Sequence, residues 1–168
     1  MAGEADAVVV LLPIKPHYAT QIMEGTKRVE FRRRPFARVP QWVVVYASAP
    51  EKRVLGCFSV RGVDECSPEG LWQRYEHVGG IDQADFAAYY TGRDRGVALL
   101  IDEVYPLDDP VELREIGDGL LPPQSYRYLE PGVIATLVGP GDLGNVGDAR
   151  GRPSVAGTRR LDRVRPLV

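Results

Sequence analysis

The sequence predicts an α+β fold in which five or six strands form a small β-barrel or a strongly curved sheet, with short helices flanking it. Short apolar runs rich in β-branched residues alternate with segments that have helical spacing. The 18 glycines and 14 prolines supply many turns between these segments. Strands joined by short turns, with helices segregated between them, are typical of α+β domains and of small barrels.

The chain begins with a predicted strand, followed by a helix. An apolar run at 7–12 has the length of a buried strand, and Pro13 is expected to end it. Pro16 suits the first position of a helix, where its missing N–H costs nothing. Gly25 suits the left-handed position just past the last turn of that helix.

The rest of the chain continues this alternation of strands and helices. Two predicted helices begin with a capping side chain. One starts at Ser67, which Pro68 follows, and the other starts at Asp82. The predicted elements are strands at 27–32, 42–46, 53–63 with a bulge at Gly56, and 96–105, helices that follow Ser67 and Asp82, and an extended segment at 121–129.

Composition indicates one domain with a C-terminal tail. We expect a domain at 1–138 and a Gly-, Pro- and Arg-rich tail at 139–168. The two cysteines and two histidines have no zinc spacing, so we expect no metal and no cofactor. No apolar run is long enough to span a membrane, and the acidic start is unlike a signal peptide. These features predict a cytoplasmic protein, and they leave the oligomeric state open.

A dense positive charge between residues 27 and 38 is the main functional signal. This window holds six basic residues and one acidic residue, whereas the whole chain has a formal charge of −2. Concentrated positive charge on an acidic chain indicates a surface that binds an anion. The alternative is a charged edge strand that keeps the sheet from aggregating.

Lys27 and Glu30 are the strongest candidate pair in this window. In a regular strand they would face opposite sides, whereas a twist or bulge beside Gly25 would bring them into one cleft. Lys27 would then contact a phosphate or polarise a carbonyl. Glu30 would accept a hydrogen bond from a base or, in an enzyme, act as a general base. The alternative is an ordinary surface ion pair.

Other candidates lie within and beyond this window. Strand alternation places Arg32 and Arg34 on the side of Glu30, where their guanidinium groups suit phosphates or base edges. Lys15 precedes the first helix, where it can meet an anion, and Ser48 lies in a turn that follows a strand. The late segment that can hold an unstacked base, or can instead be pinned on the barrel, contains Gln124, Ser125, Tyr126 and Arg127.

Two motifs together resemble the ASCH family of the PUA-like superfamily. The first is Gly25-x-Lys27-x-x-Glu30-x-Arg32, and the second is the Pro-Pro-Gln-Ser-aromatic segment at 122–126. The resemblance implies a PUA-like β-barrel of five or six strands with helices packed around it. It also implies a cleft beside the first helix and an association with RNA or modified nucleotides.

The resemblance further implies two possible hydrolytic activities. Some ASCH proteins are similar to amidohydrolases that deacetylate N4-acetylcytidine, in which a Thr nucleophile follows the Lys by three residues. Glu30 stands at that position here, which argues against a covalent acyl intermediate. Other members look like metal-stimulated ribonucleases.

Taken together, these observations predict a domain that binds RNA or a modified nucleotide through a basic cleft around 25–34. The alternative is a nucleic-acid-directed hydrolase, either a ribonuclease or an amidohydrolase acting on an acylated nucleobase. A third possibility is a regulatory module whose ligand is a small anion.

Overall fold

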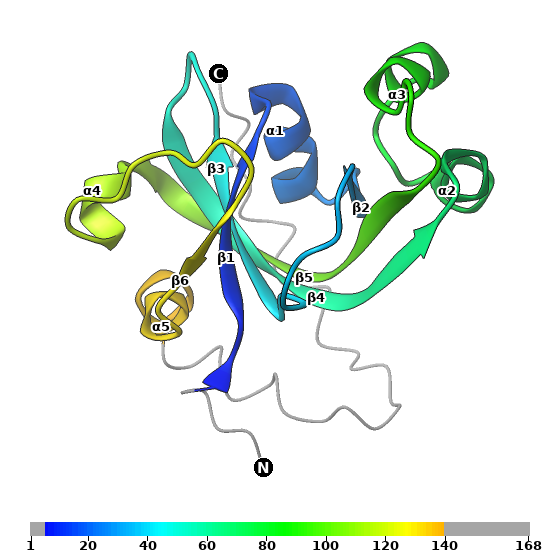
Figure 1. Cartoon of the computed structure of the whole chain (residues 1–168). Helices are drawn as coiled ribbons and strands as arrows, with labels where there is room; N and C mark the ends of the chain where they lie inside the picture. Colours follow the sequence, from blue (N-terminus) through cyan, green and yellow to red (C-terminus); the bar gives the residue numbers. More distant parts are fainter. Residues whose placement is uncertain (1–5, 140–168) are drawn as a thin grey trace.

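The computed structural model describes residues 6–139, which form one strongly curved sheet with short helices around it (Figure 1). The strands are β1 (Val9–Ile14), β2 (Val29–Arg32), β3 (Trp42–Ala47), β4 (Arg53–Cys66), β5 (Gly96–Val111) and β6 (Arg127–Leu129). The helices are α1 (Pro16–Glu24), α2 (Pro68–Tyr75), α3 (Gln83–Tyr89), α4 (Leu113–Ile116) and α5 (Gly132–Val138).

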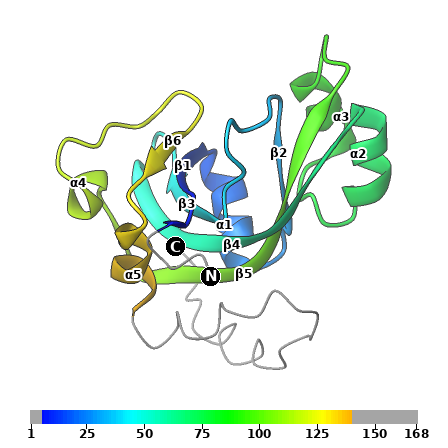
Figure 2. The ribbon, with the colours of Figure 1, turned by 60° about the horizontal axis from the view of Figure 1, so that its bottom comes forward.

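The six strands lie in the order β2-β5-β4-β3-β1-β6. β1 and β3 are parallel, and every other neighbouring pair is antiparallel. The long strands β4 and β5 bend along one side of the molecule, which gives the sheet its curvature (Figure 2). The predicted α+β class and curved sheet are therefore confirmed. The barrel is not closed, however, because β2 and β6 remain as the two edges of the sheet.

Both faces of the curved sheet are packed with apolar side chains. Val10 and Leu12 of β1 lie in a cluster with Ile22 of α1 on one face. Their neighbours Val9 and Leu11 pack on the other face, in a cluster that includes residues of α4 and α5. This alternation is the period-two pattern of a strand buried on both sides.

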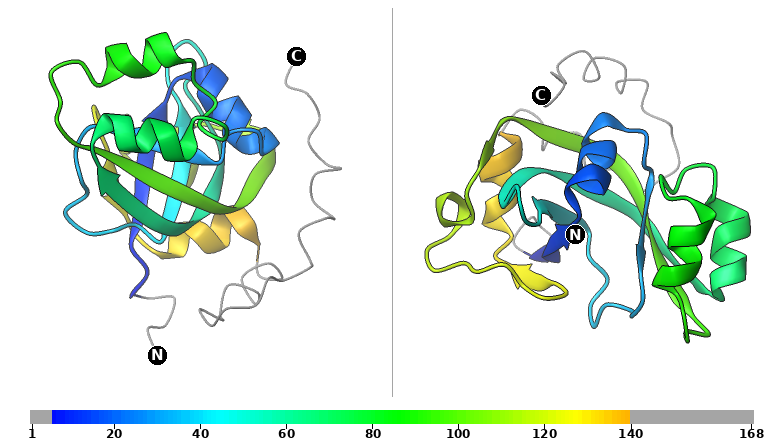
Figure 3. Two further views of the ribbon diagram at one scale, coloured as in Figure 1. Left: turned by 90° about the vertical axis from the view of Figure 1, so that its right-hand side faces the viewer. Right: turned by 90° about the horizontal axis from the view of Figure 1, so that it is seen from above.

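Helices α2 and α3 cover one end of the sheet beside β2. They lie side by side over the ends of the long strands (Figure 3). Phe31 of β2 packs in one cluster with Leu71 of α2 and Phe86 of α3. The rings of Phe31 and Phe86 meet edge to face at 5.0 Å. This packing holds β2 and the loop between the two helices in a fixed relation.

The local signals that predicted helix ends are confirmed. Gly25 is left-handed, with a φ of 83°, at the end of α1. The side chain of Ser67 accepts a hydrogen bond from the N–H of Gly70, and the side chain of Asp82 accepts one from Asp85. The bulge is also confirmed, since the β3–β4 and β4–β5 registers shift next to Gly56.

Several predicted boundaries were wrong. β1 continues through Pro13, which pairs with β3, although this proline was expected to end the strand. β6 pairs with β1 only at Val9–Leu11, so the side of β1 facing β6 has no strand partner at Pro13. A proline is tolerated there because the N–H it lacks is not needed. β4 and β5 also run further than predicted, to Cys66 and Val111.

No helix in the described part of the chain is long and apolar enough to cross a membrane. Almost all of the predicted tail, from residue 140 onward, lies outside the described residues. The domain boundary at 138 therefore stays a prediction. Helix α5 was not predicted, and it ends at this boundary.

Candidate functional site

The turn after α1 brings Lys27 and Glu30 to the same place. The N–H groups of Thr26 and Lys27 both donate to the carbonyl of Gln21, which wraps the chain tightly around the end of the helix. β2 begins only at Val29, so strand alternation does not apply to Lys27. Its Nζ lies 3.7 Å from Oε2 of Glu30. Of the two arrangements that the sequence allowed, the structure has the one in which they share a site.

The Lys27 ammonium is buried and fixed by its surroundings. The residue is 2% exposed, and Nζ donates a hydrogen bond to the carbonyl of Gly79. The rings of Tyr18 and Phe31 lie 5.1 and 5.3 Å from Nζ, where their faces attract a cation. Burial lowers the pKa of Lys27, and the nearby Glu30 carboxylate partly offsets this effect.

The loop between α2 and α3 requires glycine where it closes on Lys27. Gly80 has a φ of 63°, which a residue with a side chain rarely adopts. A Cβ at this position would lie 2.4 Å from Oε1 of Gln21 and 3.0 Å from Cβ of Lys27. A Cβ at Gly79 would lie 2.7 Å from Cε2 of Phe31. The two glycines therefore let the loop approach closely enough to hold the lysine.

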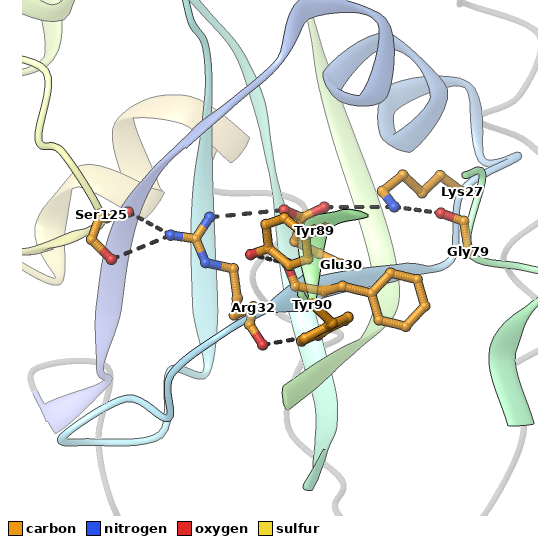
Figure 4. A network of polar contacts seen from close by, with 8 residues as sticks. Lys27, Glu30, Arg32, Gly79, Tyr89, Tyr90 and Ser125 are labelled. Atoms are coloured by element: carbon orange, nitrogen blue, oxygen red, sulfur yellow. Dashed lines mark hydrogen bonds and ion pairs between the residues drawn. The ribbon is translucent and has the colours of Figure 1, made fainter. Parts of the chain in front are cut away.

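Arg32 reaches from the edge strand β2 to the segment before the other edge strand, β6. We call the unpaired gap between these two edges the opening. Nη2 of Arg32 donates to the backbone carbonyl of Ser125 at 2.9 Å and to the Ser125 hydroxyl at 3.3 Å. Its Nη1 lies 3.9 Å from Oε1 of Glu30. Figure 4 shows Ser125, Arg32, Glu30, Lys27 and Gly79 in a row across this part of the molecule. We call Lys27, Glu30 and Arg32 the charged row.

Two tyrosines bind the backbone of the strand that contains Glu30 and Arg32: Tyr89, the last residue of α3, and Tyr90, which follows it. The hydroxyl of Tyr90 donates to the carbonyl of Arg32 at 2.9 Å, and that of Tyr89 donates to the carbonyl of Phe31 at 3.2 Å. Burial raises the pKa of both hydroxyls, so they remain protonated donors at neutral pH. These bonds fix the edge of β2 that carries the row.

The segment leading into β6 is pinned to the loop that follows β2. The hydroxyl of Tyr126 accepts from the N–H of Ala37 at 3.3 Å. The hydroxyl of Tyr128 accepts from the N–H of Arg38 at 2.7 Å and donates to its carbonyl at 3.2 Å. The ring of Tyr126 also packs on Phe36, with centroids 4.7 Å apart. These contacts are those of the alternative in which the segment is fixed on the barrel.

Exposed cations lie on both sides of this opening. Arg33 and Arg34 follow β2, and both are exposed, with the guanidinium of Arg33 4.5 Å from the ring centroid of Tyr89. Arg127 lies exposed at the start of β6, next to the exposed Gln124 and Ser125.

Three other polar residues have their own environments. Arg28 belongs to the basic window at 27–38, and its guanidinium donates to the backbone carbonyls of Ile101 and Asp102. Lys15 is exposed just before α1. Ser48 is half-buried, and its backbone N–H donates to the carbonyl of Ile14 at 2.9 Å.

A cavity that the sequence did not predict lies beside α4. It has a volume of about 350 Å³ and adjoins the segment at 122–128 through Pro122. Glu112 binds two of its cations, with distances of 3.4 Å to Arg53 and 2.6 Å to Arg114. The lining residues come from three separated segments, so no local motif marks them: Tyr46, Lys52, Arg53, Glu112, Leu113, Arg114, Leu120 and Pro122.

Comparison with known proteins gives consistent matches. The sequence profile of the ASCH domain matches residues 12–100. A Zymomonas mobilis protein described as an ASCH domain-containing ribonuclease is 29% identical over 142 residues, which are 82% of this chain and 95% of that protein. The large ribosomal subunit protein uL22 of Ureaplasma parvum is 24% identical over 129 residues, which are 76% of this chain but 41% of that protein.

Solved structures agree with the fold. The crystal structure of the ASCH protein from Zymomonas mobilis has a TM-score of 0.70 and 27% sequence identity, and the match covers 80% of this chain and 96% of that one. A serine-to-alanine variant of the same protein gives a TM-score of 0.71 at 28% identity, with the same coverage. The curved sheet with short helices is therefore shared with a solved structure over most of the described residues.

Proposed function

Because the chain belongs to the ASCH domain family, we propose that it binds RNA, with a single strand held across the opening between β2 and β6. The observation that carries this proposal is the charged row at that opening, bordered by exposed arginines. The Zymomonas relative is named as a ribonuclease, which supports RNA as the class of ligand.

The phosphates are assigned to the exposed cations rather than to the charged row. Arg34 and Arg127 lie on opposite sides of the opening and are both exposed. A guanidinium group binds a phosphate through two parallel hydrogen bonds, which gives both affinity and orientation.

A base is assigned to the charged row. Arg32 is already bound to Ser125, and Lys27 to Gly79, so neither cation is free to follow a mobile backbone. Groups fixed in this way suit the reading of a base edge, which needs hydrogen-bonding partners at set positions. Glu30, which two cations flank, is then an acceptor for a base N–H.

The test compares RNA binding by the Arg34→Ala, Arg127→Ala double variant with binding by the Arg61→Ala variant. Arg61 is an exposed arginine of β4 and serves as the matched control. Each lost phosphate contact lowers the log–log salt slope by about 0.7 for a single strand, so we expect a loss of about 1.4 in the double variant. Affinity and slope equal to those of the control would contradict the proposal.

A second candidate function is RNA cleavage, which the named ribonuclease activity of the 29% identical relative favours. Glu30 would take the proton of a ribose 2′-hydroxyl, whose oxygen attacks phosphorus and forms a 2′,3′-cyclic phosphate. The 5′-oxygen leaves with the electron pair of the broken P–O bond and takes up a proton from water. Lys27 and Arg32 would stabilise the negative charge that develops on the phosphate oxygens. Within residues 6–139, no three His, Cys, Asp or Glu side chains gather to hold a metal ion.

Cleavage is tested with labelled RNA and, separately, with N4-acetylcytidine. Turnover that is lost in both Lys27→Ala and Glu30→Gln, at a temperature at which circular dichroism shows both variants to be folded, and that is kept in Arg61→Ala would establish catalysis at the charged row. Turnover that survives both substitutions would place it elsewhere. RNA binding without turnover of either substrate would leave a binding domain.

A further inference from the structure

The charged row has a fixed order of hydrogen-bonding groups. Ammonium and guanidinium groups only donate hydrogen bonds, and a carboxylate only accepts them. Lys27, Glu30 and Arg32 therefore present a donor, an acceptor and a donor in sequence, as Figure 4 shows. The separations of 3.7 and 3.9 Å between the carboxylate and its two neighbours are those of ion pairs and exceed hydrogen-bond distance.

The groups of the row are held in place before any ligand arrives. Lys27 is bound on its far side by the carbonyl of Gly79, and Arg32 by that of Ser125. The side chain of Glu30 is 10% exposed, and neither cation of the row lies within hydrogen-bond distance of its oxygens. A buried carboxylate is stabilised by N–H donors at hydrogen-bond distance. The row is therefore suited to a ligand N–H at its centre.

Resting on the RNA-binding function proposed above, we infer that the charged row recognises a uracil base. The Watson–Crick edge of uracil consists of a carbonyl, the N3–H group and a second carbonyl. It is thus an acceptor, a donor and an acceptor, the complement of the row. The N3–H would donate to Glu30, while the two carbonyls accept from Lys27 and Arg32.

The other bases match the row less completely. Cytosine places N3, an acceptor, opposite the Glu30 carboxylate. Guanine has two adjacent donors, one of which would face a cation. Adenine offers one acceptor and one donor, so one of Lys27 and Arg32 would lose a partner. A site built around such groups rejects a ligand that leaves them unpaired, because the unpaired groups stay desolvated.

The members of the row differ in exposure. The side chains of Lys27, Glu30 and Arg32 are 3%, 10% and 16% exposed, so a base edge would contact Arg32 and Glu30 directly, whereas its contact with Lys27 requires the side chains around the ammonium to move. Tyr18 is half-buried next to Lys27, and its ring can stack on the face of a base. Stacking of this kind binds any base, so the preference for uracil rests on the charged row.

The inference is tested by fluorescence anisotropy with labelled ten-nucleotide strands of uridine or cytidine. Both carry 2′-O-methyl groups, so that cleavage cannot alter the measurement. One well-placed set of base contacts is worth roughly tenfold in affinity, and we expect the uridine strand to bind about tenfold more tightly. A strand of 3-methyluridine, in which a methyl group replaces the N3 hydrogen, should lose this advantage. A pseudouridine strand, which retains the same edge, should keep it.

The Glu30→Gln variant provides the matched test on the protein. Its amide has nearly the shape of the carboxylate but offers a donor, which suits N3 of cytosine. The preference for uridine should therefore fall at least about fivefold. Equal binding of uridine and cytidine strands, with the salt slope still dependent on Arg34 and Arg127, would overturn the uracil inference and leave RNA binding intact. Failure to bind any of the strands would overturn both.

Discussion

Replacing Lys27 with Met should strongly destabilise the protein. The substitution leaves the Glu30 carboxylate, 7% exposed, with Arg32 at 3.9 Å as its remaining cation in the row, and removes the donor to the Gly79 carbonyl. Removing one partner of a buried ion pair costs about 3–5 kcal/mol. At a typical dependence of the unfolding free energy on urea, the midpoint of unfolding falls by roughly 2 M.

The comparison with Glu30→Gln identifies the cause. If the loss comes from an uncompensated charge, adding Glu30→Gln to Lys27→Met removes that charge. The double variant should then be more stable than the sum of the single losses predicts, by about 1–3 kcal/mol. Urea unfolding can be followed through the fluorescence of the buried Trp42. Lys15→Met, at an exposed lysine, is the control and should change stability by less than about 0.5 kcal/mol. Strictly additive losses would refute the reasoning.

Two further predictions concern the same site. Gly80→Ala should destabilise the protein by at least about 1 kcal/mol more than Gly92→Ala in thermal unfolding, since both have positive φ but only Gly80 would clash with Gln21 and Lys27. Equal losses would mean that the close approach is not needed. Because the folded-state pKa of Lys27 is lowered, the unfolded chain binds more protons between that pKa and 10.5. The stability of the wild type relative to Lys27→Met, from urea unfolding at several pH values, should therefore rise between the folded-state pKa of Lys27 and 10.5 and stay flat below that pKa.

Local chemistry made much of the fold predictable. The helix ends at Gly25, Ser67 and Asp82 depend on backbone conformation or on a capping bond to a residue three positions away, so short motifs reveal them. The buried strands are marked by their β-branched residues. The lengths of β4 and β5 were underestimated, because their outer parts are half-exposed and lose the apolar pattern.

The candidate site was only partly predictable from the sequence. The motif pointed to Lys27, Glu30 and Arg32, but their relative placement depends on the wrapped turn after α1 and on the loop at Gly79. The bond from Arg32 to Ser125 joins residues 93 positions apart, and nothing local marks it. The cavity lined by Lys52, Arg114 and their neighbours likewise forms only when separated segments meet.

The open edges of the sheet explain why stability and ligand binding meet at Arg32. Where a closed barrel would have backbone bonds between β2 and β6, this protein has side-chain bonds from Arg32, Tyr126 and Tyr128. Arg32 donates to Ser125 through Nη2, while its Nη1 faces Glu30. A ligand carbonyl that accepts from Nη1 leaves the bond to Ser125 intact. A phosphate that takes both nitrogens would break that bond and release the edge. This geometry favours a neutral base edge over a phosphate at the charged row, and it leaves the phosphates to the exposed arginines on either side.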